Sequence, residues 1–449
     1  MKLIDEEKQK IVLPIAGFAR EFDGKLLLAL ISRERGHRPF LGSKAALSKQ
    51  APMLSPMLYF AKSAYTDSVE LFAELHNDGN KIAVLDEEAL VRQSDEIYLM
   101  KHHKGALQNV ALLMSWGQSD QGLWNSSTMP RNTPAVAVGN PRVDMLRPML
   151  NGYFESEVAS IVDRFGGYVL INTNFPTVNN YLTRGESFAL AAKTERAADE
   201  KREFLSYKRR VFARFKEVIP AIAREIFPRT LVIRPHPSEM HEPWLEASEG
   251  LANVKVVLEG SVVPWLMGAQ ALIHNGCTSG IEYALLNKLA LSYRSENPEK
   301  YEESLANKLS LSCNTTEALM QSLAASLSAR PLQPSKEQQE ILRQHIRIED
   351  NRLCCEAIID AVESGHLPEN IFAARFDIAR LWRANLTRIK AFLRPSRAKR
   401  KGKTQYRRHM FPNIDTDYVD ERIRRFQHCL GRFHGMRSKQ IAARAFEIV

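Results

Sequence analysis

The sequence has no apolar run long enough to cross a membrane and no secretory signal. Its longest apolar candidate, Ser261 to Ile273, is interrupted by proline, glycine and glutamine, whereas a membrane-spanning helix needs about 20 apolar residues. Residues 5–8 are charged, whereas a signal peptide would have its apolar segment in this region. We therefore expect a cytoplasmic protein.

Cysteine is scarce, and the common phosphate-loop signatures are missing. The five cysteines are odd in number and lack the spacing of a zinc site or a disulfide framework, so we expect reduced thiols. There is no P-loop, no G-x-G-x-x-G motif and no internal repeat. A phosphate group would therefore have to be bound by motifs other than these.

The composition is that of a globular protein of two or three domains. The chain has 449 residues, of which 44% are hydrophobic and 25% are charged. The net charge of +10 is unevenly distributed, because residues 371–449 hold 20 Lys/Arg and 6 Asp/Glu and therefore carry +14. The remainder of the chain is close to neutral.

The basic segment suggests an anionic partner. Its densest run extends from Arg394 to Arg408 and follows apolar residues at near-helical spacing, from Phe372 to Leu393. Such a segment is typical of a helix that binds the inner face of a membrane, which we favour over nucleic acid. A solvated basic face, with the apolar stripe packed on the rest of the protein, is the alternative.

Short β-like runs alternate with helical patterns through most of the chain, which predicts an α/β fold with parallel sheets. We expect two Rossmann-like, doubly wound domains, residues 1–150 and 151–330, facing a cleft, and a helical, basic C-terminal extension over residues 331–449. Ligands of such sheets bind at the carboxyl ends of the strands. The predicted strands are Ile11–Ala16, Lys81–Leu85, Leu112–Ser115, Ala135–Val138, Tyr168–Asn172, Thr230–Arg234, Val254–Leu258, Ala271–His274 and Leu289–Tyr293.

Two motifs in the second half favour binding of a phosphate group. The strand ending at Arg234 continues into Pro-His-Pro-Ser, a stiff loop that presents Arg234, His236 and Ser238. The strand ending at His274 continues into Asn275-Gly-Cys-Thr-Ser-Gly and a helix, whose first N–H groups attract an anion. Each motif alone also fits an ordinary turn, whereas the pair indicates a nucleotide site.

Carboxylates and amides follow other predicted strands. Asp86, Glu87 and Glu88 follow one strand and are candidate catalytic groups, although acids also favour a helix start. Further candidates lie after the remaining strands, where plain turn or cap chemistry is the alternative. They are Arg20, Glu21 and Asp23, then Asn140 and Arg142, then Asn172 and Asn174.

In this order the motifs resemble those of bacterial surface-carbohydrate biosynthesis proteins. These motifs make the chain similar to GT-B glycosyltransferases, including capsule Kdo transferases and polysialyltransferases, over roughly residues 10–330. The motifs are Arg20-Glu21-x-Asp23, Asp86-Glu87-Glu88, Gly139-Asn140-Pro141-Arg142, Asn172-Thr173-Asn174-Phe175, Arg234-Pro235-His236-Pro237, and Asn275-Gly276-Cys277-Thr278-Ser279-Gly280 with Glu282.

The resemblance implies a glycosyltransferase that moves a sugar from a nucleotide-activated donor to a polysaccharide or lipopolysaccharide precursor. Relatives that transfer ulosonic acids such as Kdo use a CMP donor without an obligatory metal, and this sequence has no Asp-x-Asp at a predicted strand end. No cofactor is expected. The acceptor would meet the first domain, at Arg20, Glu21, Asp23, Asn140 and Arg142. The donor would be held by Asn172, Asn174, Arg234, His236, Ser238, Asn275, Thr278, Ser279, Gly280 and Glu282.

Three other functions stay open at this point. A sugar-nucleotide epimerase uses a similar two-domain fold, and a glycerophosphotransferase for teichoic-acid-like polymers shares the His-Pro and Ser/Thr-Gly pair. A nucleic-acid-binding protein would use the basic C-terminal segment. The sequence names neither the sugar nor the acceptor, and it does not decide between an inverting and a retaining reaction.

Overall fold

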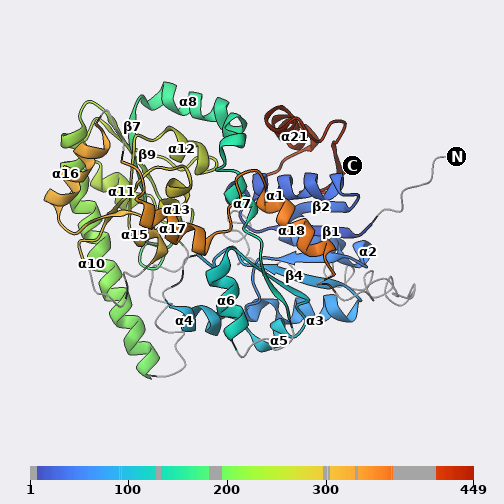
Figure 1. Ribbon diagram of the computed structural model, residues 1–449. Coiled ribbons are helices and arrows are strands. Elements are labelled where there is room, and N and C mark those ends of the chain that lie inside the picture. Colours follow the sequence, from blue (N-terminus) through green and yellow to red (C-terminus); the bar gives the residue numbers. More distant parts are fainter. Residues whose placement is uncertain are drawn as a thin grey trace, which may run out of the picture. The chain divides into compact units, whose positions relative to one another are not determined.

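The computed structural model divides the chain into two compact units (Figure 1). The first comprises Met1–Ala89, Ser94–Tyr153 and Arg343–Val449, and the second comprises Leu90–Gln93 and Phe154–Leu342. The structure describes residues 8–90, 92, 94–127, 133–181, 195–296, 301, 304–328, 332–365, 367 and 411–449. The amphipathic stripe and the basic run lie outside these residues.

The first unit is built on an eight-stranded sheet of order β13-β14-β2-β1-β3-β4-β5-β6. The strands from β1 to β6 are parallel, whereas β14 pairs antiparallel with β2 and β13. The sheet strands are β1 (Lys10–Ile15), β2 (Arg38–Ser43), β3 (Leu58–Ala61), β4 (Lys81–Leu85), β5 (Leu112–Ser115), β6 (Ala135–Ala137), β13 (Ser438–Ala442) and β14 (Ala445–Ile448).

Helices connect these strands and cover the sheet. The parallel strands β1 to β6 are apolar over nearly their whole length, because such strands are buried on both faces of the sheet. The helical elements are α1 (Phe18–Glu34), α2 (Lys44–Leu54), η1 (Thr66–Ser68), α3 (Val69–Asn77), α4 (Asp95–Lys101), α5 (Lys104–Leu107), α6 (Gln118–Ser126), α7 (Pro141–Asp144), η2 (Pro148–Phe154), α18 (Cys354–Glu363) and α21 (Thr416–Leu430).

The second unit has a six-stranded parallel sheet of order β12-β11-β10-β7-β8-β9. Its strands are β7 (Tyr168–Asn172), β8 (Thr230–Arg234), β9 (Val254–Val256), β10 (Ala271–His274), β11 (Leu291–Tyr293) and β12 (Leu311–Cys313). Its helices are α8 (Glu155–Phe165), α10 (Glu195–Ile226), α11 (Glu242–Ala247), α12 (Val263–Gly268), α13 (Thr278–Leu285), α15 (Leu305–Lys308) and α16 (Thr316–Ser326); α17 (Lys336–His345) contains the point where the chain returns to the first unit.

The predicted α/β class with two Rossmann-like parallel sheets is confirmed, and every predicted strand is present to within a few residues. Strands β2, β3, β12, β13 and β14 were missed. Pro39 and Gly42 give β2 the composition of a turn, and β3 and β12 are only 4 and 3 residues long. The predicted cleft stays a prediction, and so do the predicted domain bounds.

The C-terminal part of the chain, from Arg343 onward, belongs to the first unit. Figure 1 shows α18 (orange) and α21 (red) beside α1 (blue), and both helices contact α1. The helices predicted for this segment are present, but the chain ends in a hairpin, β13–β14, that extends the sheet past β2. A side chain on Gly42 would come within 2.3 Å of the Arg444 carbonyl oxygen, so glycine is needed for this strand pairing.

In the parts of the chain that the structure describes, every helix is either too short or too polar to span a bilayer.

Candidate functional site

The carboxyl edge of the first sheet carries a cluster of charged side chains, four of them buried and two, Arg20 and Glu88, partly exposed. We call it the acidic cluster: Glu21, Lys25, Glu87, Glu88, Arg20 and Arg142. Three local structures bring it together. Strand β1 ends at Ile15, and α1 begins three residues later; strand β4 ends directly before Asp86; and α7 begins at Pro141, after β6. Parallel strands bring these ends to one edge of the sheet, as the sequence predicted.

Glu21 and Lys25 form the centre of the acidic cluster. Glu21, 1% exposed, accepts hydrogen bonds from the backbone N–H groups of Ala16 (3.0 Å) and Gly17 (3.1 Å). Lys25 lies one turn later on α1, and its Nζ donates to Glu21 Oε2 (2.9 Å) and to the Pro14 carbonyl (2.7 Å). Burial by itself would raise the pKa of Glu21, but Lys25 and the other donors lower it to about 2.

Glu87 is the least well paired member of the acidic cluster. Its side chain is 2% exposed, with Oε1 3.6 Å from Lys25 Nζ and Oε2 3.9 Å from an Arg142 nitrogen. Oε2 has no hydrogen-bond partner among the described residues. Burial raises the pKa of Glu87, and the neighbouring Glu21 adds to that effect.

Glu88 is the accessible carboxylate of the acidic cluster. Its side chain is 43% exposed, and Oε1 accepts a hydrogen bond of 2.8 Å from the Arg20 guanidinium. Partial burial acts to raise the pKa of Glu88, but Arg20 outweighs it and the pKa lies below its ordinary value. Glu88 is therefore ionised at neutral pH, fixed in direction by Arg20 and open to solvent.

Asp86, by contrast, is fully occupied by structural hydrogen bonds. It is 3% exposed; Oδ2 accepts from the Tyr98 hydroxyl (3.0 Å) and lies 3.2 Å from His102 Nε2, while Oδ1 accepts from the Glu88 N–H (2.9 Å). Its carbonyl accepts from the Trp116 indole (2.6 Å). These contacts hold the turn that presents Glu87 and Glu88.

The other residues predicted on this unit have mixed surroundings. Asn140 is fully buried and caps α7, its side chain accepting from the Arg142 N–H (2.9 Å). The Arg142 guanidinium lies over the Trp116 ring and beside Glu87. Asp23 lies on α1 and accepts a hydrogen bond from the Tyr153 hydroxyl (2.7 Å) rather than joining the acidic cluster.

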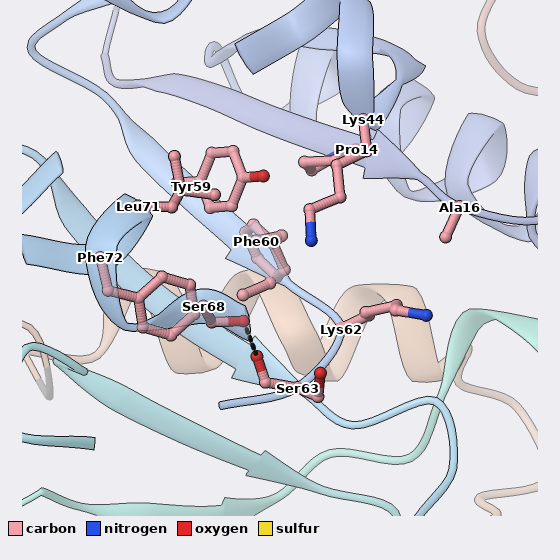
Figure 2. Close-up of a pocket in the computed structure, with 11 residues that line it drawn as sticks. Pro14, Ala16, Lys44, Tyr59, Phe60, Lys62, Ser63, Ser68, Leu71 and Phe72 are labelled. Atoms are coloured by element: carbon pink, nitrogen blue, oxygen red, sulfur yellow. Dashed lines mark hydrogen bonds between the residues drawn. The ribbon is translucent and has the colours of Figure 1, made fainter. Parts of the chain in front are cut away.

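A narrow pocket opens beside the acidic cluster, at the carboxyl ends of β1 and β3 (Figure 2). Aromatic side chains, including Tyr59 and Phe72, line it, and two lysines, Lys44 and Lys62, reach it from α2 and the end of β3. The Lys62 carbonyl accepts a hydrogen bond from the Glu87 N–H (3.2 Å), which joins the pocket wall to the carboxylate turn.

In the second unit, a buried glutamate organises the carboxyl edge of the sheet. Glu239, 3% exposed, accepts hydrogen bonds from the Thr173 hydroxyl (2.8 Å), the Phe175 N–H (2.7 Å) and the Trp244 indole (3.0 Å). The Thr173 hydroxyl in turn accepts from the His236 N–H (3.1 Å). The loops after β7 and β8 are therefore held in one arrangement.

Arg234 is directed into the protein. It is 6% exposed, its guanidinium stacks 4.7 Å from the Trp265 ring, and it donates to the carbonyls of Glu259 (2.8 Å) and Gly260 (3.4 Å). These contacts support the loop after β9. Burial lowers the pKa of Arg234 to about 10. Its predicted phosphate contact stays a prediction.

The loop after Arg234 contains a turn that is closed by a hydrogen bond to the His236 side chain. The Ser238 N–H donates to His236 Nδ1 (3.2 Å), so His236 is oriented by its own loop, and both side chains are half-buried. Asn174 donates to the Gly276 carbonyl (3.2 Å) and thereby joins the loops after β7 and β10. Asn172 is buried at the end of β7, and its Oδ1 lacks a hydrogen-bond partner among the described residues.

The loop after β10 is held by His274 and Asn275. His274 is fully buried; its Nε2 lies 2.8 Å from the Ser310 hydroxyl, and burial lowers its pKa to about 3. A side chain on Gly280 would come within 2.5 Å of this Nε2, so Gly280 serves close packing. Helix α13 begins at Thr278, with Ser279 and Glu282 buried in its first two turns.

Lys208 completes this edge, and sequence reasoning missed it. Its Nζ donates to Asn275 Oδ1 (3.3 Å), and the Asn275 amide donates to the Tyr293 carbonyl (3.2 Å). The signal was present in the sequence, because Lys208 occupies a position of α10 that is in helical register with the apolar residues Phe204, Val211 and Phe215. The structure thus brings Asn174, Asn275 and Lys208 together.

No group of three or more His, Cys, Asp or Glu side chains within the described ranges is arranged to hold a metal ion.

Solved structures of similar architecture support this description. UDP-GlcNAc 2-epimerase from Neisseria meningitidis, bound to UDP-GlcNAc, is 12% identical; the match covers 79% of this chain and 99% of that chain, with a TM-score of 0.51. The chain has a GT-B-type fold. No protein-family model matches it, and no curated protein matches it by sequence.

Two further GT-B-type structures resemble the chain at lower scores. UDP-GlcNAc 2-epimerase from Methanocaldococcus jannaschii is 10% identical, with 79% and 99% of the two chains covered and a TM-score of 0.48. The wall teichoic acid polymerase TagF is also 10% identical, with 87% and 90% covered and a TM-score of 0.47.

Proposed function

We propose that the protein is a glycosyltransferase that moves a sugar from a nucleotide-activated donor to a precursor of a surface polysaccharide or lipopolysaccharide. The observation that carries the proposal is the polar carboxyl edge on each of its two Rossmann-like sheets. One edge holds the acidic cluster, and the other holds amides and Lys208. An acid–base site and a nucleotide site are the two parts such a transferase needs.

The donor is proposed to bind the second unit. His236, Ser238, Asn174, Asn275 and the start of α13 at Thr278 offer hydrogen-bond donors and a helix N-terminus, both suited to a phosphate. A CMP-linked ulosonic acid such as Kdo is the donor we favour from the motif resemblance. No metal or cofactor is part of this proposal.

The acceptor is proposed to bind the first unit at the acidic cluster, since the adjoining pocket of Figure 2, at about 10 Å³, is too small for a sugar. Glu88 is the proposed catalytic carboxylate, because it alone of the three predicted acids is exposed and is fixed by a hydrogen bond from Arg20. As a base it would accept the proton of the acceptor hydroxyl while that oxygen displaces the nucleotide phosphate from the sugar. As a nucleophile it would itself displace the nucleotide phosphate, and the acceptor hydroxyl would then displace the carboxylate from the sugar. Asp86 and Glu87 would position it.

A sugar-nucleotide epimerase is the second candidate, and the fold likeness to the Neisseria meningitidis epimerase favours it. That enzyme class converts its nucleotide sugar without an acceptor. Association of the basic segment with the inner membrane surface is proposed only alongside the transferase, whose lipid-linked acceptors would lie there.

The test is thermal stabilisation of the purified protein by CMP, CDP, UDP and GDP, since a ligand that binds only the folded state raises its melting temperature. A CMP-selective shift, followed by sugar transfer from CMP-Kdo to a glycan acceptor, would support the transferase. A UDP-selective shift with conversion of UDP-GlcNAc in the absence of acceptor would support the epimerase. No shift with any nucleotide would overturn both.

A further inference from the structure

Lys208 is a charged residue on the core-facing side of a long helix. Its neighbours in helical register on α10 are buried: Val211 and Phe215 are each 0% exposed and belong to the hydrophobic core of the second unit. Lys208 itself is only partly buried, yet lysine is rarely placed on such a face, because removing an ammonium group from water is costly. A polar residue that breaks an apolar pattern marks a position with a function.

The surroundings of Lys208 stabilise its charge only in part. Its Nζ lies 5.4 Å from the centre of the Tyr207 ring and 5.9 Å from that of Phe204, and it donates one hydrogen bond, to Asn275 Oδ1. No carboxylate among the described residues forms an ion pair with it. Burial lowers the pKa of Lys208 to about 8, with no opposing charge to raise it.

The ammonium is held at the edge where the donor is expected. Asn275, its hydrogen-bond acceptor, directly follows β10 and is itself fixed by the Tyr293 carbonyl. The next residue, Gly276, adopts a positive φ of 57° and receives the Asn174 amide. Lys208 therefore lies beside two loops of the predicted nucleotide site, although it comes from neither.

Arg234, the cation that the sequence did predict for this site, is engaged elsewhere. Its guanidinium donates to two backbone carbonyls and stacks on Trp265. Of these two cations, both in the described part of the chain, Lys208 is the one whose charge is not directed to backbone carbonyls.

We propose that Lys208 binds a phosphate group of the nucleotide donor, as the positively charged member of a site completed by Asn275 and Asn174. The inference rests on the proposed function, because it takes the donor to be a nucleotide. An anion at this position would supply the counter-charge that the core-facing lysine lacks. A phosphate would also favour the protonated form of Lys208, so binding should weaken as the pH rises above about 8.

The experiment is calorimetric titration of the wild-type protein, Lys208→Met, Lys208→Arg and Lys216→Met with CMP, UDP and the nucleosides cytidine and uridine. Lys216 is the matched control, a lysine on the same helix two turns away that lies over the Phe212 ring. For the nucleotide that the wild type binds, Lys208→Met should weaken affinity by about tenfold or more, the scale of a charged hydrogen bond. Lys208→Arg should retain most of the affinity, and Lys216→Met all of it.

Two readouts separate phosphate binding from a structural role. Affinity for the nucleosides, which lack phosphate, should be the same in the wild type and in Lys208→Met. Between pH 7 and pH 9.5, the wild type should lose nucleotide affinity while Lys208→Arg should not, since arginine stays charged. If Lys208→Met lowers nucleoside and nucleotide affinity alike, the residue acts through the fold and the inference is wrong.

The failure of this inference can be told from the failure of the proposed function. Equal nucleotide affinity of the wild type and a folded Lys208→Met would overturn the role of Lys208 and leave the nucleotide site standing. No nucleotide binding by the wild type would overturn both. If Lys208→Met does not fold, Lys208→Gln and the pH comparison of wild type with Lys208→Arg give the same decision.

Discussion

The carboxylate of Asp144 caps a helix that begins 210 residues later in the chain. Its Oδ1 accepts from the Cys354 N–H (2.7 Å) and its Oδ2 from the Cys355 N–H (2.9 Å), at the first turn of α18. Asp144 is fully buried. The contact ties the returning C-terminal part of the chain to the first unit, immediately after the turn that carries Asn140 and Arg142.

Replacing Asp144 with alanine should destabilise the protein by about 2 kcal/mol or more, because two buried N–H groups lose their acceptor. Asp415→Ala is the matched control, since Asp415 caps the exposed start of α21 through a single bond to the Tyr418 N–H; it should cost about 1 kcal/mol or less. Urea denaturation followed by circular dichroism measures both. Equal effects would show that the Asp144 contact has no special role.

Stability should also depend on pH through Asp144. Burial raises its pKa to about 6, from 3.8 for the unperturbed group, although the two N–H groups oppose the rise. Between these values the folded state binds a proton that the unfolded state has released, so this residue's contribution to stability falls as the pH rises from about 4 to 6. Asp144→Asn should lack that component. The test compares denaturation midpoints of the two proteins at pH 4.5 and pH 7; parallel pH dependence would contradict the assignment.

In the proposed transferase reaction, Glu88→Gln should abolish most sugar transfer while leaving the fold intact. The change removes the negative charge that Arg20 orients. Loss of a catalytic acid–base group typically lowers the reaction rate by about 100-fold or more. Because Glu88 is half exposed, its stability effect should be small. Glu74→Gln, at an exposed position of α3, is the control. Unchanged turnover with CMP-Kdo would remove Glu88 from the reaction.

Asp86→Ala should act on stability as well as on activity. The Tyr98 hydroxyl and His102 lose their buried acceptor, which costs about 1–3 kcal/mol. The turn carrying Glu87 and Glu88 should loosen, so turnover falls together with the melting temperature. A variant that keeps wild-type stability would show that the Asp86 hydrogen bonds do not hold the turn.

Lys25→Met should destabilise the first unit by about 3 kcal/mol, because Glu21 and Glu87 would remain buried without their shared cation. The double variant Lys25→Met, Glu87→Gln should recover part of that loss by removing one of the two negative charges. A double-mutant cycle from urea denaturation measures the coupling. Additive effects would mean that Lys25 and Glu87 do not interact across 3.6 Å.

The sequence by itself determined the α/β class and the position of the motifs along the sheets. Apolar runs such as Leu231–Arg234 and Ala271–His274 predict buried parallel strands, and the polar loops that follow them must then meet at one edge. This geometry follows from local pattern alone, so Asn174, His236 and Asn275 could be assigned to one edge before the structure was known.

The tertiary structure decided what each side chain does there. Asp86, Glu87 and Glu88 are adjacent acids in the sequence, but burial, hydrogen bonding and the distance to Arg20 give them three different surroundings. Arg234 donates to backbone carbonyls, which only the path of the loop after β9 could reveal.

Long-range contacts could not be predicted from the sequence either. Asp144 accepts a hydrogen bond from Cys354, the hairpin β13–β14 pairs with β2, and Lys208 donates to Asn275. In each case the partners are far apart in the chain and become neighbours only when the core packs. Local periodicity records which face of an element is buried, and it contains no information about which distant element covers that face. The sequence therefore determined the fold class and the edge of each sheet, while packing decided the charge and hydrogen-bond partners of each candidate residue.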